Sequence, residues 1–246
     1  MKVPQERLFL LNAGKVASNN LNEGLAVDFA ALLSAAVPAM PADKISIMQE
    51  AASLGILKRM WLAGQLLNDE FGSEVVSSLK AHESDTVRGW ACFILSMAQA
   101  PSVKERLRSV LEFANDSHFG VREWAWLAMR PHIAEQLEES IAFLSSWTSS
   151  PSERIRRFSC ESIRPRGVWR THIGILKNNP ALGLPILESL CGDCSSYVQD
   201  SVGNWLNDAA KTQPMWVQEL CARWKVEKPG KATDRICKRA LRSISK

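Results

Sequence analysis

Three acidic residues each lie in a stretch that is otherwise rich in basic or aromatic side chains. Glu123 precedes Trp124, Glu161 lies among arginines, and Asp208 closes a Leu-Asn-Asp sequence. A carboxylate can stabilise positive charge that develops on a reacting group, or orient a water molecule for attack. It also repels an anionic ligand, so its presence in a basic segment needs an explanation. The two explanations are catalysis and a structural ion pair with a neighbouring Arg or Lys.

Residues 153–169, with the sequence ERIRRFSCESIRPRGVW, hold five Arg against two Glu. If the segment is helical from Glu153 to Arg164, then Arg157, Glu161 and Arg164 occupy positions i−4, i and i+3 and share one face. A carboxylate between two guanidinium groups stays ionised. The alternative interpretation of this segment is a solvated helix with one packed Trp.

Pro165 is expected to stop this helix, because proline disfavours helical geometry in the residue before it. Arg166 and Trp169 then lie just beyond the stop. An arginine fork suits a phosphate, and a partly exposed Trp can stack on a base or hold a cation over its face. The segment therefore combines a phosphate-binding group with an aromatic group for a base or a cation.

The composition is that of an ordinary globular protein, with 246 residues of which 46% are hydrophobic and 23% charged. The net charge of +4 is uneven, since residues 223–246 hold nine Lys or Arg against two acids and residues 151–170 hold six Arg against two acids. This concentration predicts a polyanionic partner, with nucleic acid favoured over the alternative of a solvated basic tail. No stretch resembles a transmembrane span or a signal peptide, which predicts a cytoplasmic protein with no membrane partner.

The six cysteines and four histidines form no recognisable metal or catalytic motif. Cys191 and Cys194 have CxxC spacing but no second pair, so most cysteines are interpreted as small core residues. The histidines are far apart and are interpreted as surface or capping residues: His82, His118, His132 and His172. We therefore predict no metal and no cofactor.

The chain is predicted to be helical almost throughout, because no alternating strand pattern and no hairpin signal occurs. We expect a short helix within residues 1–20, a second helix over Leu21–Val37, and a long amphipathic helix over Lys44–Leu67.

A sequence pattern then recurs along the chain. The segment DTVRGWA that starts at Asp85 resembles FGVREWA from Phe119 and ERIRRFS from Glu153, and weaker copies start at Ser196 and Asp234. The aliphatic anchors of the five copies lie 34, 34, 43 and 38 residues apart. This spacing is typical of HEAT or armadillo helical-hairpin repeats, in which neighbouring units stack and share a core.

These repeats predict an all-α solenoid of about six helical pairs with a concave basic face. The whole chain, 1–246, is predicted to be one domain. Its approximate repeats are residues 1–40, 41–80, 81–115, 116–150, 151–190 and 191–246. Because successive inner helices pack about 8–10 Å apart, we expect Glu123, Glu161 and Asp208 to converge on one groove.

Four segments carry a resemblance to a known family. They are REWAWLAMRP (122–131), SERIRRFSCESIRPRGVW (152–169), SSYVQDSVGNWLNDAAKTQP (195–214) and, more weakly, RICKRALRSI (235–244). They resemble the DNA alkylation repair proteins built of HEAT-like repeats, the AlkC/AlkD type of alkylpurine DNA glycosylase, and are closer to the AlkC branch. The resemblance implies cleavage of the N-glycosidic bond of cationic alkylated purines such as 3-methyladenine or 7-methylguanine.

The resemblance also implies residue roles. The catalytic candidates are Glu123, Glu161 and Asp208. Since a cationic base is already a good leaving group, these carboxylates need only favour an oxocarbenium-like sugar and orient a water. The lesion-contacting candidates, whose aromatic faces attract a cation, are Trp169, Trp124 and Trp205. The DNA-backbone candidates are Arg157, Arg164, Arg166, Lys211, Lys238, Arg239 and Arg242.

The predicted partner is double-stranded DNA that contains alkylated bases, with no obligate protein partner. Two features depart from the family. The chain ends after the last repeat, where the AlkC branch often has a further β domain, and Trp205 precedes Leu-Asn-Asp where the family more often has His. A non-catalytic binder of damaged or branched DNA and a protein-binding HEAT scaffold are the alternatives.

Overall fold

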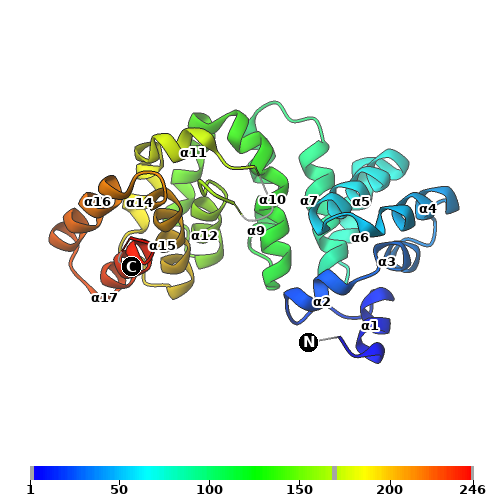
Figure 1. Cartoon of the computed structure of the whole chain (residues 1–246). Coiled ribbons are helices and arrows are strands. Elements are labelled where there is room, and N and C mark those ends of the chain that lie inside the picture. Colours follow the sequence, from blue (N-terminus) through cyan, green and yellow to red (C-terminus); the bar gives the residue numbers. More distant parts are fainter. Residues whose placement is uncertain (1–2, 168–170, 245–246) are drawn as a thin grey trace. The chain divides into compact units, whose positions relative to one another are not determined.

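The computed structural model describes residues 3–167 and 171–244, and all regular secondary structure in these ranges is helical (Figure 1). The predicted all-α class is confirmed. Within the same ranges, each helix is too short or too polar to cross a bilayer. Contacts group the chain into two compact units, unit 1 with Met1–Pro101 and Glu105–Met129, and unit 2 with Ser102–Lys104 and Arg130–Lys246. The single domain of six repeats and its concave basic face stay predictions.

Helices α1 to α10 belong to unit 1, except that α8 and α10 cross its boundary with unit 2. Their bounds are α1 Gln5–Asn12, α2 Leu21–Ala26, α3 Phe29–Ala36, α4 Ala42–Glu50, α5 Ile56–Phe71, α6 Val76–Lys80, α7 Asp85–Met97, α8 Val103–Ser109, α9 Leu111–Ala114 and α10 Phe119–Glu135.

Unit 2 continues with seven α-helices in its described part. Their bounds are α11 Leu137–Ser145, α12 Glu153–Glu161, α13 Gly174–Asn178, α14 Leu184–Leu190, α15 Ser196–Ala210, α16 Pro214–Glu227 and α17 Lys231–Leu241. Helix α15 packs against both α12 and α17, and the three lie together in Figure 1.

Two predicted helices of unit 1 are interrupted. The helix expected over Leu21–Val37 is two helices, because the Asp28 side chain accepts from the backbone N–H groups of Ala30 and Ala31 and starts α3. The helix expected over Lys44–Leu67 is also two, since α4 passes into a 3-10 turn and α5 begins after Gly55. The error arose because apolar spacing continues through short breaks that a local cap or turn decides.

The recurring sequence pattern marks the start of a helix in four copies, namely α7, α10, α12 and α15, and the fifth copy begins three residues inside α17. Its aliphatic anchors are all buried: Val87, Val121, Ile155, Val198 and Ile236. The repeat prediction is therefore confirmed at the level of local structure.

In the first three copies an Arg follows the anchor, and two of these arginines have the same structural role. Arg88 Nη1 donates to the carbonyls of His82 and Glu83 in the preceding turn, and its Nε donates to Asp116 at 3.0 Å. Arg156 repeats both interactions, with two carbonyls of its preceding turn and with Asp193. Arg88 and Arg156 each connect the turn before their own helix to an Asp in the turn before the next repeat helix. This contact explains why the pattern recurs at a similar spacing.

Gly89 provides a test of how tightly unit 1 is packed. A Cβ at this position would lie 2.5 Å from Trp124 Cδ1 and 2.7 Å from Met60 Cε. We expect Gly89→Ala to lower the free energy of unfolding by about 1–3 kcal/mol, because a close-packed core must shift to admit it. Urea unfolding measures this. Gly55→Ala is the matched control, since no atom lies within 4 Å of its added Cβ; equal losses in both variants would contradict the packing argument.

Candidate functional site

Two of the three predicted acids meet at one guanidinium group in unit 2. Glu161 is the last residue of α12 and Asp208 lies in α15. Arg164 Nη1 donates to Glu161 Oε1 at 2.7 Å, while its Nη2 and Nε donate to Asp208 Oδ2 at 2.8 and 3.0 Å. The Glu161 and Asp208 side chains are only 4% and 6% exposed. Arg164 therefore joins the two acids in one buried cluster.

Glu161 is held on every side. Its Oε2 accepts from Ser201 Oγ at 2.7 Å, and Arg157 Nη2 lies 3.6 Å away. Burial acts to raise the pKa of Glu161, but the charges of Arg157 and Arg164 outweigh it and lower the pKa below its ordinary value. Arg157 and Arg164 both lie beside Glu161 as predicted, although Arg164 lies beyond the end of α12 rather than on its face. The lowered pKa favours the ionised form of the carboxylate.

Asp208 is held less completely than Glu161. Within the described residues, its Oδ1 accepts only a long bond of 3.4 Å from Lys211 Nζ, and the Lys211 side chain is 47% exposed. Arg166 Nε donates to the backbone carbonyl of Asp208 at 3.2 Å. Asp208 Oδ1 is consequently the least firmly bonded carboxylate oxygen of this cluster within the described residues.

The segment after α12 is positioned by two buried donors. The helix ends at Glu161, three residues before the predicted Arg164, which leaves backbone carbonyls without helical partners. Arg130, which is 2% exposed, donates to the carbonyls of Ser162 at 2.9 Å and Arg164 at 2.5 Å. Trp205 Nε1 donates to the Ile163 carbonyl at 3.0 Å.

The tryptophan candidates differ in what surrounds them. Trp205 is fully buried, and its ring occupies space next to Gly183. Trp124 is 8% exposed and packs against the Phe93 ring in unit 1, with centroids 6.3 Å apart. Trp169 lies outside the described residues. Both described rings have a packing role in the free protein, and their contact with a lesion stays a prediction.

Glu123, the third predicted acid, belongs to unit 1. It is half-buried, and its Oε2 accepts from Trp126 Nε1 at 2.9 Å, one turn further along α10. Its approach to Glu161 and Asp208 stays a prediction.

The basic candidates of unit 2 are anchored rather than loose. Arg157 lies over the ring of Tyr197, with Cζ 4.5 Å from the centroid. Arg239 Nε in α17 donates to Asn204 at 2.9 Å, and Arg242 Nε, directly after α17, donates to Asn207 at 3.2 Å. Both asparagines lie in α15. Lys238 is exposed. Thus α15 supports the basic side chains of α17 and also carries Asp208.

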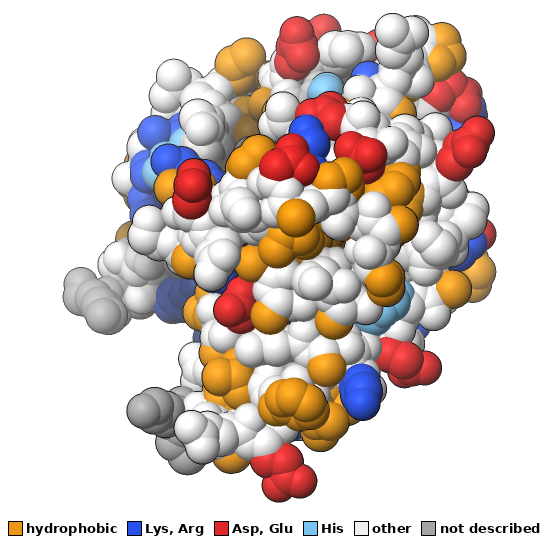
Figure 2. All heavy atoms as spheres, turned by 90° about the vertical axis from the view of Figure 1, so that its right-hand side faces the viewer, with side chains coloured by type: hydrophobic (Ala, Val, Ile, Leu, Met, Phe, Trp, Pro, Cys, Tyr) orange, Lys and Arg blue, Asp and Glu red, His pale blue; other side chains and the backbone are white. Residues whose placement is uncertain are grey.

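A different surface appears on the face drawn in Figure 2, where hydrophobic side chains spread between acidic ones and Lys and Arg are sparse at the centre. Among the exposed hydrophobic residues of unit 1 are Phe9, Leu21, Leu25, Ile47 and Leu54. The centre of this face therefore lacks the basic character expected for contact with a polyanion.

Sequence reasoning missed three residues near the cluster. Ser201 precedes Asp208 by seven residues, and this i, i+7 spacing on one helix face was an available signal. Arg130 and His172 gave no signal, because they reach the site only through tertiary contacts. His172, with Thr171, Arg130, Pro131 and Ala134, lines a cavity of about 300 Å³ beside the loop that follows α12.

Metal chemistry has no site among residues 3–167 and 171–244, since no group of three His, Cys, Asp or Glu side chains is arranged to hold an ion. Cys191 is buried and Cys194 is exposed, and both are free thiols.

With this geometry established, the chain can be compared with known proteins. A model of the family described as "DNA alkylation repair enzyme" matches residues 58–239. The chain belongs to this family. The resemblance predicted from the segments within residues 122–131, 152–169 and 195–214 is thereby confirmed.

The individual relatives match this chain over different lengths. The chain is 40% identical over 119 residues to "Uncharacterized protein YhaZ" from Bacillus subtilis (strain 168), a match that covers 48% of this chain and 33% of that protein. The structure of Pseudomonas fluorescens alkylpurine DNA glycosylase AlkC bound to DNA containing an abasic site analog is 23% identical with a TM-score of 0.71, covering 100% of this chain and 66% of that one. AlkD2 from Streptococcus mutans is 22% identical with a TM-score of 0.64, covering 82% and 97%. The match therefore spans about a third of the length of the curated relative. The two solved structures share the helical-repeat fold of this chain.

The lowered pKa of Glu161 predicts a pH-dependent contribution to stability. Because the pKa is lower in the folded than in the unfolded protein, ionised Glu161 stabilises the fold above its unfolded pKa of about 4.3, and this contribution is lost as pH falls through the lowered folded pKa. We expect Glu161→Gln to lower the free energy of unfolding by about 3–5 kcal/mol at pH 7, since it leaves buried arginine charge less compensated.

Urea unfolding of both proteins at neutral and acid pH measures this effect. The difference between the wild type and Glu161→Gln should shrink towards acid pH. The control is Glu138→Gln, an exposed acid of α11. A difference between wild type and Glu161→Gln that is the same at both pH values would rule out the linkage.

Proposed function

We propose that the chain is a monofunctional DNA glycosylase that excises cationic N-alkylated purines, such as 3-methyladenine and 7-methylguanine, from double-stranded DNA in base excision repair. The observation that carries the proposal is the Glu161–Arg164–Asp208 cluster, in which two acids from separate motifs share one buried guanidinium in a member of the DNA alkylation repair enzyme family. The similar AlkC structure holds DNA with an abasic site analog, and an abasic site is the product of this reaction.

The chemistry requires no cofactor. The alkylated base leaves with the electron pair of its N-glycosidic bond and becomes neutral, while positive charge develops on the sugar. Water then attacks the anomeric carbon and loses a proton to a carboxylate or to solvent. Negative charge placed beside the sugar stabilises the transition state more than the ground state, which is how a fixed carboxylate accelerates the reaction.

In this scheme the two clustered acids have different tasks. Asp208 faces the sugar or the water through Oδ1, whose bond to half-exposed Lys211 is long and easily exchanged. Glu161 acts as a positioning residue, since its two oxygens already accept from Arg164 and Ser201. Arg164 transmits this order to Asp208 through a two-donor contact with Oδ2.

The remaining candidates complete the proposed complex. Glu123 supplies a third carboxylate near the lesion, and Trp169, Trp124 and Trp205 supply aromatic surface. Lys211, Arg166 and Arg157, together with the basic residues of α17, bind the DNA backbone, which makes binding strongly salt-dependent.

Asp208→Asn tests the catalytic assignment. We expect the rate of base excision to fall by at least about 100-fold, because a neutral amide no longer stabilises developing positive charge. Binding to unmodified duplex should weaken little or become tighter, since a negative charge is removed. The measurement is chromatographic detection of 3-methyladenine and 7-methylguanine released from methylated DNA.

The control variant is Asp234→Asn, which removes the same charge from an exposed position in α17. Full excision by Asp208→Asn would remove Asp208 from the chemistry. A heat-denatured sample sets the background of spontaneous base loss.

A second function is favoured by one observation. Three of the four carboxylate oxygens of Glu161 and Asp208 already accept short hydrogen bonds from Arg164 and Ser201. This saturation suits a non-catalytic binder of damaged or branched DNA, in which the acids only hold arginines in place. Wild-type protein that binds DNA and releases no base would favour this function over the glycosylase, and absence of DNA binding would leave a protein-binding scaffold.

A further inference from the structure

The cavity beside the loop after α12 contains none of the residues that the proposed reaction uses. Its volume is about 300 Å³, and it is lined by Pro131 and Ala134 as apolar surface and by Arg130, Thr171 and His172 as polar surface. Both apolar residues come from α10, and both are exposed towards solvent. A ligand for this cavity thus needs an apolar part and a polar part.

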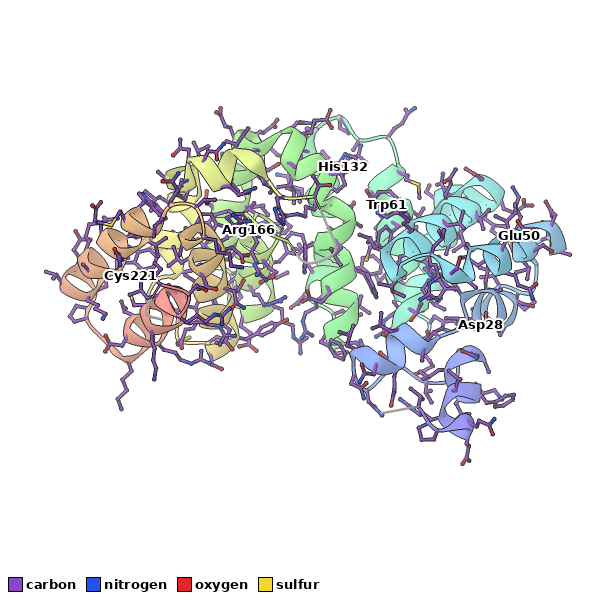
Figure 3. The ribbon with its side chains drawn as sticks, in the orientation of Figure 1. Asp28, Glu50, Trp61, His132, Arg166 and Cys221 are labelled. Atoms are coloured by element: carbon purple, nitrogen blue, oxygen red, sulfur yellow. The ribbon has the colours of Figure 1, made fainter. Side chains whose placement is uncertain are left out.

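The loop that carries Thr171 and His172 is held at its described ends. The backbone N–H of Ile173 donates to the Pro165 carbonyl at 3.1 Å. Gly167 rests against the Arg130 guanidinium, where an added Cβ would lie 3.1 Å from Cζ. Arg166, labelled in Figure 3, is tied to the carbonyl of Asp208. These contacts fix the described polar rim of the cavity to α10 and α15.

Charge around the cavity is mainly positive. The charged groups that act on His172 are Arg130 from α10, Arg166 from the loop, Lys177 from α13 and Asp208 from α15. Although His172 is exposed, slight desolvation lowers its pKa, and Lys177, Arg166 and Arg130 lower it further, while Asp208 opposes them. Asp208 is itself paired with Arg164. An anion in the cavity would therefore meet a cationic rim and a neutral imidazole.

We propose that this cavity binds one phosphate group and that His172 takes up a proton when the phosphate enters. The phosphate source that fits best is a backbone phosphodiester of DNA, because its sugar can pack on Pro131 and Ala134 while Thr171, His172 and Arg130 face the phosphate oxygens. This assignment rests on the proposed function for the identity of the partner, but it does not require excision.

The proton uptake follows from electrostatics. A phosphate oxygen beside the imidazole favours the charged ring, so that bound phosphate raises the pKa of His172 from its lowered value in the free protein. DNA affinity must then rise as pH falls through the interval between the bound and free values. Glu161, whose pKa is lowered, stays ionised in that interval and adds no dependence.

Two substitutions at one position separate charge from titration. Affinity for an unmodified duplex is measured by fluorescence anisotropy between about pH 8 and about pH 5.5, the range in which a histidine titrates. For the wild type we expect tightening with acid that is bounded by about tenfold per pH unit for one proton. His172→Ala should bind weakly without this acid-induced tightening. His172→Lys should bind tightly across the range, because its charge is permanent.

The matched control is His132→Gln, which removes a histidine of α10 that does not line the cavity and that Figure 3 labels. It should keep the wild-type pH dependence. At acid pH, His172→Ala should also show a salt slope smaller than that of the wild type by about 0.9, the value for one phosphate contact. An unchanged pH dependence in His172→Ala would overturn the proposal.

A direct readout distinguishes the source of the phosphate. The pKa of His172 is followed by NMR in the free protein, with inorganic phosphate alone, and with unmodified duplex. A rise of the His172 pKa with duplex supports the proposal. A rise with inorganic phosphate but none with duplex overturns DNA as the occupant. No rise with either probe overturns the site. Wild-type protein that shows the rise with duplex but releases no alkylated base removes the glycosylase and leaves this site standing.

Discussion

The sharing of Arg164 between Glu161 and Asp208 is the interaction on which the rest of unit 2 depends. Burial acts to lower the pKa of Arg164, but Glu161 and Asp208 outweigh it and raise the pKa, so the guanidinium stays charged. A buried charge without a partner costs several kcal/mol, whereas charges that neutralise one another and complete their hydrogen bonds are tolerated. Two acids for one buried arginine leave an excess of negative charge, which Arg157 and Lys211 reduce. Removal of any one member therefore changes the environment of all the others.

The position of the Arg164 backbone is fixed by hydrogen bonds to backbone carbonyls, in addition to the ion pairs of its side chain. Since α12 ends at Glu161, the following carbonyls need donors, and Arg130 and Trp205 provide them from α10 and α15. The backbone of Arg164 is thus held from two helices while its side chain is held by two carboxylates. This arrangement restricts the position of Arg164. It also explains why an indole occupies position 205, because only a side chain with a long reach and one donor fills the space beside Gly183 and still meets the Ile163 carbonyl.

Local spacing was sufficient to predict part of this arrangement. The approach of Arg157 to Glu161 follows from helical periodicity, and the buried anchors at spacings of 34 to 43 residues follow from the repeat. The contact between Arg164 and Asp208 was not specified by spacing, since it depends on how α12 packs against α15. Arg130 and His172 were missed for the same reason, as each enters the site from a neighbouring element. The early end of α12 was missed because the donors that compensate for the lost helical bonds come from distant segments. Sequence periodicity describes which residues share a face, whereas the partner of that face is set by tertiary packing.

An apparent conflict between acids and DNA is resolved by the same cluster. In the proposed complex, carboxylates beside a polyanion would weaken binding if they were uncompensated. Glu161 is compensated by guanidinium groups that burial keeps in place, with its side chain 4% exposed, so it presents little free negative charge to a phosphate. Asp208 differs, because Lys211 covers its Oδ1 from a half-exposed position. If DNA phosphate attracts Lys211 in the proposed complex, Asp208 Oδ1 loses that cation when the substrate is bound. The negative charge that the reaction needs would then become available only in the complex, and DNA binding would not have to overcome it beforehand.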